Sequence, residues 1–392
     1  MSIVIFGDLF SFPEGGAATN RVHCYARGFR ENGVNVIVVC FLSKYGDNDN
    51  GVVDGVKYYY PFQEKKRSKY FFVRFWKKVK KCRASYRLLK NLNKEDKIIG
   101  INSWTNLLST HLFAWFLSKS FKAKLIIEGS EHPLRFYQGG KMREMQGAIK
   151  LYIESRFCDG ILCISRYLVD FYKEHGVPSR KLLLVPSTVD PTAFSRMTNK
   201  PVPGKYIGYF GSLSFKRDNV DMLINAFADF HIQYPDIRLI LGGFCTQDVK
   251  RQMVDLIDKL NISSKVKMLD FLSRKEILEY ITNADVLVMT RSKDLESAAS
   301  YPSKLTEFLA TGKPVISVNV GEVSDFLKDS DNAFLVEPGN VQELASKLDF
   351  VYKNYEFAQQ VGRKGKELTE GVFSYKYQAK RIIAFIGSLS VK

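Results

Sequence analysis

Long apolar runs are missing from this 392-residue sequence. We find no stretch of about 18 apolar residues, the length that a membrane-spanning helix requires. The first ten residues, "MSIVIFGDLF", lack the basic region and the cleavage site of a signal peptide, so we expect them to form a first strand. With 45% hydrophobic and 25% charged residues, the composition is typical of a soluble globular protein.

Cysteine is scarce and shows no metal-binding pattern. The six cysteines are scattered through apolar segments, and none forms a C-x-x-C pair. This spacing argues against both a zinc site and a disulfide framework. A reducing, cytoplasmic environment fits the sequence best.

Acidic residues are absent from 65–90, "KKRSKYFFVRFWKKVKKCRASYRLLK", which holds twelve of the 58 Lys and Arg. A 4-3-4-3 apolar spacing predicts a helix with one apolar stripe, made of Phe75, Val79, Cys82, Tyr86 and Leu89. We expect its basic remainder, helped by Phe71, Phe72 and Trp76, to attach the protein peripherally to the anionic inner face of a membrane. Two alternatives stay open: a stripe packed on a sheet beneath solvated lysines, or a nucleic-acid contact, which we do not expect.

What is present is an alternation of short β-branched runs and amphipathic helices, repeated almost from end to end. This alternation indicates parallel sheets flanked by helices, and the length indicates two domains. The strand candidates of the first half are 3–6, 34–40, 97–102, 124–128, 160–165 and 182–186. Those of the second half are 206–211, 237–243, 266–271, 285–290 and 314–318.

A segment without periodicity, "PTAFSRMTNKPVPG" (191–204), separates the two series and holds three of the twelve prolines. We therefore predict an α/β protein with two doubly wound, Rossmann-like domains that face a central cleft. Residues 1–190 would form the N-terminal domain, 191–204 the linker and 205–372 the C-terminal domain. Residues 373–392 would form a helix that packs back on the N-terminal domain. Because ligands bind beyond the carboxyl ends of strands in such sheets, we look for a site in the loops that follow them.

The stretch "YPSKLTEFLATGKPVIS" (301–317) is one loop of this kind, followed by a short helix. Pro302 suits the first helical position, because its missing N–H would have no partner there. Gly312 followed by Pro314 ends the helix, which is about ten residues long.

The same helix has one apolar stripe, which consists of Leu305, Phe308 and Leu309. Ser303, Glu307 and Ala310 fall on the opposite side, so Glu307 is not expected to point into the core. With Ser303 and Lys304 in its first turn, the N-terminus of the helix is suited to bind an anion. The side of the helix that carries Glu307 could therefore face a bound ligand as well as solvent.

This stretch, with "YFGSLSFKRDNVDMLINAF" (209–227) and "DNAFLVEPGNVQELASKL" (331–348), resembles the retaining glycosyltransferases of family 4, which have the GT-B fold. Weaker similarity lies in 14–39, which begins "EGGAATNR", and in 158–190, which begins "CDGILCIS". The likeness covers most of the chain. It implies a nucleotide-sugar donor as substrate, retention of the anomeric configuration, no cofactor and no obligatory metal.

The resemblance also implies roles for particular residues. The glutamate with which this family holds the ribose hydroxyls of the donor falls on Glu307, and a carboxylate suits two vicinal hydroxyls. The pyrophosphate of the donor would then rest on Lys216 or Arg217 and on the amides of Ser303 and Lys304.

In the first half of the chain, Gly15 and Gly16 would allow a ligand to approach the backbone closely. Glu131 and His132 follow the strand 124–128, where the family has a residue that contacts the sugar or the acceptor. The alternative for His132 is a histidine that only orders its loop.

The sequence departs from the family pattern in two places. Ala299 stands where the family often has a second glutamate, and Glu296 cannot be assumed to replace it. Gly211 is followed by Ser212, where the family tends to have an arginine, and we still predict that Gly211 and Ser212 contact the donor. Stabilisation of the leaving group would then rest on three cations, Lys216, Arg217 and Lys304.

Asp-x-Asp, the metal-binding motif of transferases with another fold, occurs at 47–49 and 329–331. Both triplets lie in polar connections and not at the end of a strong strand. We interpret them as loop residues and predict no metal site.

These observations predict a retaining hexosyltransferase, with a UDP- or GDP-linked donor and a glycan or lipid-linked acceptor, in bacterial surface polysaccharide synthesis. Two alternatives remain: a nucleotide-sugar epimerase of similar fold and a basic nucleic-acid-binding protein. The donor base, the sugar, the acceptor and the linkage depend on pocket shape, which none of these motifs specifies.

Overall fold

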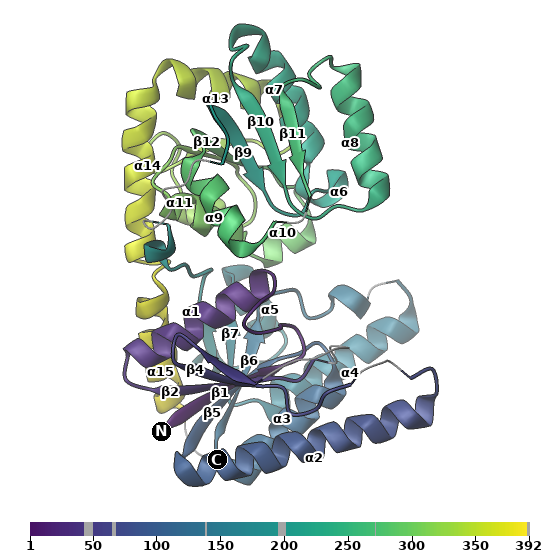
Figure 1. Cartoon of the computed structure of the whole chain (residues 1–392). Helices are drawn as coiled ribbons and strands as arrows, with labels where there is room; N and C mark the ends of the chain where they lie inside the picture. The colour runs from purple at the N-terminus through teal and green to yellow at the C-terminus, as the bar shows by residue number, and fades with distance from the viewer. Residues whose placement is uncertain (43–49, 65–67, 138, 195–200, 271, 390–392) are drawn as a thin grey trace. The chain divides into compact units, whose positions relative to one another are not determined.

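The computed structural model divides the chain into two compact units, and each is described by itself (Figure 1). Unit 1 comprises Met1–Pro186 and Tyr375–Lys392, and unit 2 comprises Ser187–Ser374. The structure describes all residues except 43–49, 65–67, 138, 195–200, 271 and 390–392.

Unit 1 is built on an eight-stranded sheet of strand order β3-β4-β2-β1-β5-β6-β7-β8. Neighbouring strands run parallel except β3 and β4, which are antiparallel. The chain direction across the sheet reverses between β1 and β5, which makes this the topological switch point. The strands are β1 (Ser2–Gly7), β2 (Asn35–Cys40), β3 (Gly51–Val53), β4 (Val56–Tyr59), β5 (Ile98–Trp104), β6 (Lys124–Gly129), β7 (Gly160–Cys163) and β8 (Leu182–Leu184).

Helices cover both faces of this sheet, so β1 is buried on both sides. Ile3 and Ile5 belong to one core and Val4 and Phe6 to the other, because side chains alternate along a strand. The helices of unit 1 are α1 (Ala17–Glu31), α2 (Phe71–Glu95), α3 (Leu108–Phe121), α4 (Lys141–Phe157), α5 (Arg166–Glu174) and α15 (Tyr375–Ser388). Short 3-10 turns occur at Arg135–Tyr137 and Ser179–Lys181, and in unit 2 at Pro191–Ala193.

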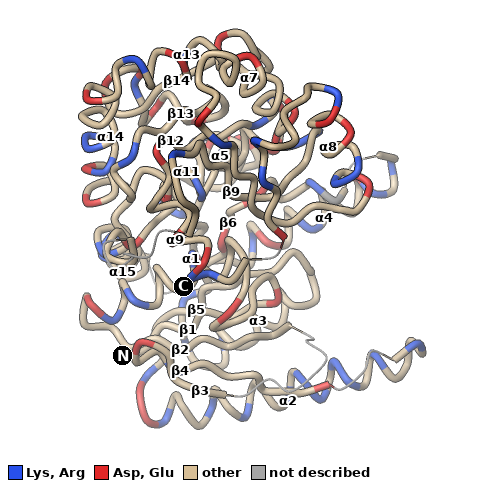
Figure 2. Tube along the Cα trace, turned by 45° about the horizontal axis from the view of Figure 1, so that its top comes forward, with Lys and Arg blue, Asp and Glu red and all other residues tan. Residues whose placement is uncertain are grey.

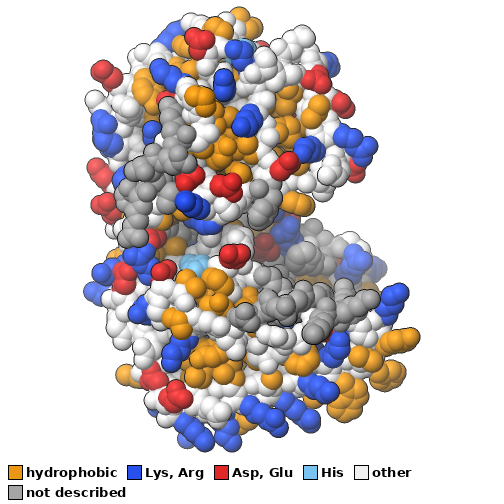
Figure 3. All heavy atoms as spheres, viewed as in Figure 1, with side chains coloured by type: hydrophobic (Ala, Val, Ile, Leu, Met, Phe, Trp, Pro, Cys, Tyr) orange, Lys and Arg blue, Asp and Glu red, His pale blue; other side chains and the backbone are white. Residues whose placement is uncertain are grey.

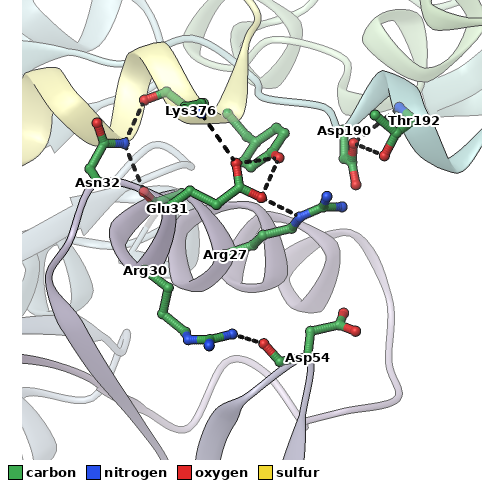
Figure 4. Close-up of polar contacts among 10 residues, drawn as sticks. Arg27, Arg30, Glu31, Asn32, Asp54, Asp190, Thr192 and Lys376 are labelled. Carbon is green, nitrogen blue, oxygen red and sulfur yellow. Dashed lines mark hydrogen bonds and ion pairs between the residues drawn. The ribbon is translucent and has the colours of Figure 1, made fainter.

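The C-terminal helix α15 packs against α1 within unit 1 (Figure 4). Glu31, at the end of α1, accepts hydrogen bonds from Tyr375 Oη at 2.8 Å and from Arg27 Nε at 2.8 Å. The side chain of Asn32 donates to the carbonyl of Lys376 at 3.1 Å. Residues Tyr375–Lys392 therefore belong to unit 1, whereas the sequence analysis began this segment at 373.

Unit 2 is built on a six-stranded, wholly parallel sheet of order β11-β10-β9-β12-β13-β14. Its switch point lies between β9 and β12. The strands are β9 (Tyr206–Phe210), β10 (Arg238–Gly242), β11 (Val266–Leu269), β12 (Val286–Met289), β13 (Val315–Val318) and β14 (Phe334–Val336).

Helices pack on both faces of this sheet as well, so its central strands are almost entirely apolar and buried. The helices are α6 (Phe215–Asp218), α7 (Val220–Gln233), α8 (Gln247–Lys259), α9 (Arg274–Asn283), α10 (Leu295–Ala299), α11 (Ser303–Ala310), α12 (Val323–Phe326), α13 (Val341–Lys353) and α14 (Tyr355–Glu370). Among the helices of the described part of the chain, none is both long and apolar enough to cross a membrane.

The predicted fold class is confirmed, since both units are doubly wound, Rossmann-like domains. The edge hairpin β3–β4 was missed because its residues are mostly half-buried or exposed and form no continuous apolar run. The strand β14 was also missed, although β8, which is equally short, was predicted. The proposed linker, 191–204, belongs to unit 2 where the structure describes it. The helix expected within 65–90 begins at Phe71 and continues to Glu95.

Candidate functional site

The carboxyl ends of β9 and β12 lie side by side at the switch point of unit 2, where ligands bind in sheets of this kind. Hydrogen bonds join the loops that follow the two strands. Thr290 Oγ1 donates to the carbonyl of Asp218 at 2.6 Å. The backbone N–H and the hydroxyl of Ser292 both donate to the carbonyl of Arg217 at 3.0 Å. The two loops thus form one surface, and the first turn of α11 adds to it.

Lys304, in the first turn of α11, lies directly against the backbone of Gly211. A Cβ atom added to Gly211 would stand 1.7 Å from the Lys304 ammonium, so no other residue fits there without moving the lysine. The ammonium also lies 5.9 Å from the centre of the Tyr209 ring. Gly211 therefore allows the cation to reach the end of β9.

The charges around Lys304 are mixed. Burial lowers the pKa of Lys304 to about 8, and the nearby Arg217 and Arg291 act in the same direction. Asp218 and Glu307 raise it and keep it from falling further. The ammonium is charged at neutral pH and loses its proton in the mildly alkaline range.

Two buried side chains of this cluster were missed by the sequence analysis. Asp218 Oδ2 and Arg291 Nε have no hydrogen-bond partner among the residues that the structure describes. Burial raises the pKa of Asp218, and the charges of Lys304 and Arg217 oppose that rise. Burial lowers the pKa of Arg291, whose Nη2 donates to Ser300 Oγ at 2.9 Å. Buried polar atoms are normally paired, so these two suit a site that receives a polar ligand.

A signal for both residues exists in the sequence. Arg291 follows β12 closely, and Asp218 comes directly after the predicted Lys216 and Arg217. The rule that strand-end loops carry ligand contacts would have selected Arg291. An arginine in a polar loop is ordinarily solvated, so Arg291 does not stand out by residue type alone.

Lys216 and Arg217 lie on α6, a single turn that is capped by the side chain of Ser214. Lys216 is exposed, while Arg217 is half-buried and pairs with Glu296 at 3.6 Å. Ser212 is exposed at the rim of the same loop. The structure thus brings these three predicted residues to the edge where Lys304 and Gly211 lie.

Glu307 is not a solvated glutamate. Its side chain is only 13% exposed, and Oε1 pairs with Arg274 Nη2 at 2.9 Å. Arg274 is the first residue of α9, whose start is fixed by a reciprocal capping box between Ser273 and Glu276. The carboxylate is thus held in place by an arginine that the sequence gave no reason to select.

Helix α11 differs in two details from the prediction. It begins at Ser303, with Pro302 as the N-cap residue, and it is eight residues long. Ala310, expected on the free side with Glu307, is fully buried. The short helix is covered more widely than one apolar stripe suggests, because α14 packs on it as well as the strands β12 and β13.

In unit 1, Glu131 and His132 lie in the loop after β6, as expected. Glu131 is exposed and pairs with Arg135 at 3.1 Å. His132 Nδ1 accepts the N–H of Leu134 at 3.2 Å, and its ring packs edge-on against Phe171 at 4.7 Å. Burial and, to a lesser degree, the charge of His175 lower the pKa of His132. The imidazole is thus neutral at pH 7 and already tied into its loop.

Gly15 and Gly16 precede α1. A Cβ on Gly15 would come within 2.1 Å of Thr19 Oγ1, so this glycine is required by local packing. Nothing lies within 4 Å of the corresponding position at Gly16, which is open to a ligand. A buried ion pair in unit 1 was missed: Arg21 Nε and Glu128 Oε1 lie 2.9 Å apart.

Within the described ranges, no group of three or more His, Cys, Asp or Glu side chains could hold a metal ion. Asp329 and Asp331 pair with Lys347 and Lys364, each at 2.9 Å. The other triplet, at 47–49, lies outside the residues that the structure describes.

The fold is that of the GT-B glycosyltransferases. The chain superimposes on a sucrose-phosphate synthase from Thermosynechococcus elongatus with a TM-score of 0.71 and 16% identity, covering 99% of this chain and 98% of that one. It superimposes equally well on Anabaena HepE in complex with UDP-glucose, with a TM-score of 0.71, 16% identity and coverage of 99% and 100%. At this identity the similarity establishes the fold.

Residues 192–368, nearly all of unit 2, match the model of the family "Glycosyl transferases group 1". A glycosyltransferase of Methanocaldococcus jannaschii is 24% identical over 214 residues, which are 54% of this chain and 55% of that protein. The N-acetyl-alpha-D-glucosaminyl L-malate synthase of Bacillus anthracis is 24% identical over 39% of this chain and 37% of its own length. The matches thus span about half of these relatives or less.

Proposed function

We propose that this chain is a retaining glycosyltransferase that moves a hexosyl group from a nucleotide-sugar donor to a glycan or a lipid-linked acceptor. The observation that most supports this proposal is that Lys304, Arg291 and Glu307 lie close together at the carboxyl ends of β9 and β12. These residues lie inside the segment that matches group 1 glycosyltransferases. Two cations and one held carboxylate suit a ligand that carries both phosphates and hydroxyls.

The chemistry required is departure of the nucleoside diphosphate through an oxocarbenium-like transition state. Negative charge grows on the departing pyrophosphate, and fixed cations aimed at that charge lower the barrier. Lys304 lies against the backbone of Gly211, so its ammonium is already at the end of β9 before the donor arrives. Lys216 and Arg217 add charge at the more exposed rim.

Glu307 would accept the ribose hydroxyls. Arg274 holds one of its oxygens and would orient the carboxylate rather than neutralise it, because the Arg274 side chain is 41% exposed and its charge is partly screened by solvent. In unit 1, Glu131 and His132 are the residues that would contact the sugar or the acceptor, and Gly16 leaves room at the start of α1.

A nucleotide-sugar donor is supported by the Anabaena neighbour, which binds UDP, UDP with glucose, and UDP-glucose. The acceptor is less constrained. One relative is an N-acetyl-alpha-D-glucosaminyl L-malate synthase, and one structural neighbour is a lipopolysaccharide outer core galactosyltransferase, so proteins of this fold use different acceptors. A bacterial surface polysaccharide, assembled at the inner face of the membrane, remains our proposal, as does a reaction without a metal or cofactor.

Calorimetry with UDP and GDP, in the presence and absence of a chelator, tests the donor site. We expect one nucleotide to bind and the chelator to leave its affinity unchanged. Product analysis with donor alone separates this proposal from an epimerase, which would convert the donor without any acceptor. The anomeric configuration of the transferred sugar, read by NMR coupling constants, tests retention.

A further inference from the structure

Helix α2 begins with an exposed aromatic end. Its first two turns and the residue before them present apolar side chains on all sides, each at least 42% exposed: Tyr70, Phe71, Phe72, Val73, Phe75 and Trp76. Figure 2 shows this end of α2 reaching out past the strands of unit 1, and Figure 3 shows hydrophobic and basic side chains mixed there. A helix end that is apolar all round is normally covered by something.

The apolar stripe of α2 is buried at one end of the helix and exposed at the other. Leu89 is fully buried in the core that α2 and α3 share, and Cys82 and Tyr86 pack partly against that core. Phe75, at the other end of the same stripe, is more than half exposed. The stripe thus packs the second half of α2 against the core of unit 1, while its residues in the first half stay exposed to solvent.

A groove of about 460 Å³ lies where the open and the buried parts meet. Six of its lining residues are apolar or weakly polar: Phe75, Val79, Cys82, Tyr86, Phe113 and Phe116. The charged members are both cations, Lys78 and Arg83. A volume in this range is ordinary for a small-molecule site, and the lining suits a hydrocarbon chain attached to an anionic head.

The neighbouring helix α4, which packs against α3, extends the apolar face. It exposes a second stripe at 3-4-3 spacing, formed by Met142, Met145, Ile149 and Tyr152. Helix α3, which contacts both α2 and α4, also exposes apolar side chains, Leu112 and Phe116, so the apolar residues of the three helices form a surface rather than a scatter of single side chains.

The structure also shows which cations of α2 are engaged elsewhere. Lys81 is buried, donates to the carbonyl of Phe41 at 2.5 Å and has its pKa lowered by burial to about 8. Lys77 pairs with Glu64, and Lys78 donates to Ser109. The exposed cations of α2 are Arg74, Lys80, Arg83, Arg87, Lys90 and Lys94.

We propose that unit 1 docks on an anionic phospholipid bilayer, inserting the aromatic end of α2 and seating one lipid chain in the groove between α2 and α3. Trp, Tyr and Phe favour the membrane interface, and exposed Lys and Arg favour anionic headgroups. The absence of acidic residues from 65–90 selects an anionic bilayer over a second copy of this cationic chain. The inference refines the membrane part of the proposed function and does not depend on the donor chemistry.

Co-sedimentation with phosphatidylcholine vesicles, with and without phosphatidylglycerol, tests the docking. We expect binding only with phosphatidylglycerol and weakening with salt. The variant Phe71→Ser, Phe72→Ser, Trp76→Ser should bind at least tenfold more weakly. Ile232→Ser, which removes an 84% exposed side chain from α7 in unit 2, is the matched control and should bind like wild type.

Charge reversal separates the exposed cations from the engaged ones. Arg74→Glu, Lys80→Glu and Arg87→Glu together should weaken vesicle binding at least a hundredfold, since each exposed cation is worth about fivefold. Reversal of Lys259 and Lys267, both exposed in unit 2, is the control and should have little effect. Reversal of Lys81 should instead destabilise unit 1.

The groove is tested with parinaric acid, a fluorescent polyene fatty acid. We expect one equivalent to bind and Val79→Trp, which fills the groove, to abolish its binding. Equal sedimentation with neutral vesicles, no sedimentation with either vesicle, or binding to RNA in place of vesicles would overturn the proposal. So would a wild-type dimer that the serine variant converts to monomer. Nucleotide binding by calorimetry, unchanged in every α2 variant, keeps these outcomes separate from the donor site.

Discussion

Both units are doubly wound sheets, but their switch points are built differently. In each, a glycine lies at the end of the first strand beside the switch point, and the position of its missing Cβ is already occupied. At Gly7, the last residue of β1, the occupant is the backbone carbonyl of Trp104, 2.1 Å from where a Cβ would stand. At Gly211, after β9, it is the ammonium of Lys304. At the end of β1 the space is taken by backbone that cannot move aside, and at the end of β9 by a flexible lysine side chain. A similar strand order therefore does not give the two units similar binding sites.

The largest expected effect comes from making the same substitution at both glycines. Gly7→Ala forces a methyl group into a backbone carbonyl that cannot move aside, and should destabilise unit 1 by about 3 kcal/mol. Gly211→Ala meets only the end of a flexible lysine, so it should cost less than about 1 kcal/mol of stability while displacing the cation. Urea unfolding and nucleotide calorimetry separate the two. Loss of stability in both variants, with nucleotide affinity intact, would break the comparison.

Removing the charge itself is the next test. Lys304→Met should lower turnover by about 10²–10³, the range for removing one preorganised group that stabilises developing charge. Nucleotide affinity should fall less than turnover, because the charge on pyrophosphate grows in the transition state. Single-turnover kinetics with the matching donor measure this. A variant with wild-type turnover would show that the pyrophosphate lies elsewhere.

The pH dependence of nucleotide affinity tests whether Lys304 contacts the pyrophosphate. The pKa of Lys304 is lowered to about 8, so its ammonium is present below that pH and disappears as the pH rises through it. Affinity for the nucleoside diphosphate should therefore decline from about pH 8 upward, and bound pyrophosphate should move the midpoint higher. Lys304→Arg should keep its affinity over the same range. An identical decline in that variant would assign the titration to another group.

Glu307 should show an intermediate effect. Glu307→Ala should weaken nucleotide binding by about 1.5–3 kcal/mol, the range for hydrogen bonds to a charged group. Arg274→Ala removes its partner while keeping the carboxylate, and should weaken binding less. Calorimetry on both variants decides the order. Unchanged affinity in folded Glu307→Ala would leave the carboxylate with a structural role only.

The smallest effect is expected at the rim. Arg217 and Glu296 form a partly exposed pair at 3.6 Å, so Glu296→Gln should change stability and nucleotide affinity by no more than about 1 kcal/mol. Thermal unfolding and calorimetry measure the two quantities. A larger loss of affinity would mean that Glu296 takes over the part of the glutamate that Ala299 replaces.

Much of the fold could be read from local pattern, because long strands and helices carry their own periodicity. The hairpin of β3 and β4 could not, since its residues are mostly half-buried or exposed and form no continuous apolar run. The sequence motifs selected Lys216, Arg217, Lys304 and Glu307. In the structure these residues lie on α6 and α11, beside the carboxyl ends of β9 and β12. Their roles stay predictions until the variants above are measured.

The sequence by itself determined the two doubly wound domains, the strand-end loops and the stripe of α2, because each depends on residues close together in the chain. Only the tertiary structure decided which charges meet. Asp218 reaches the β12 loop through Thr290, 72 positions along the chain, and Lys304 reaches Gly211 across the sheet edge. It also decided that Lys81 is buried while Arg74 is exposed. Burial and pairing depend on neighbours that folding brings together from distant segments, and these neighbours set the pKa and the availability of each charge.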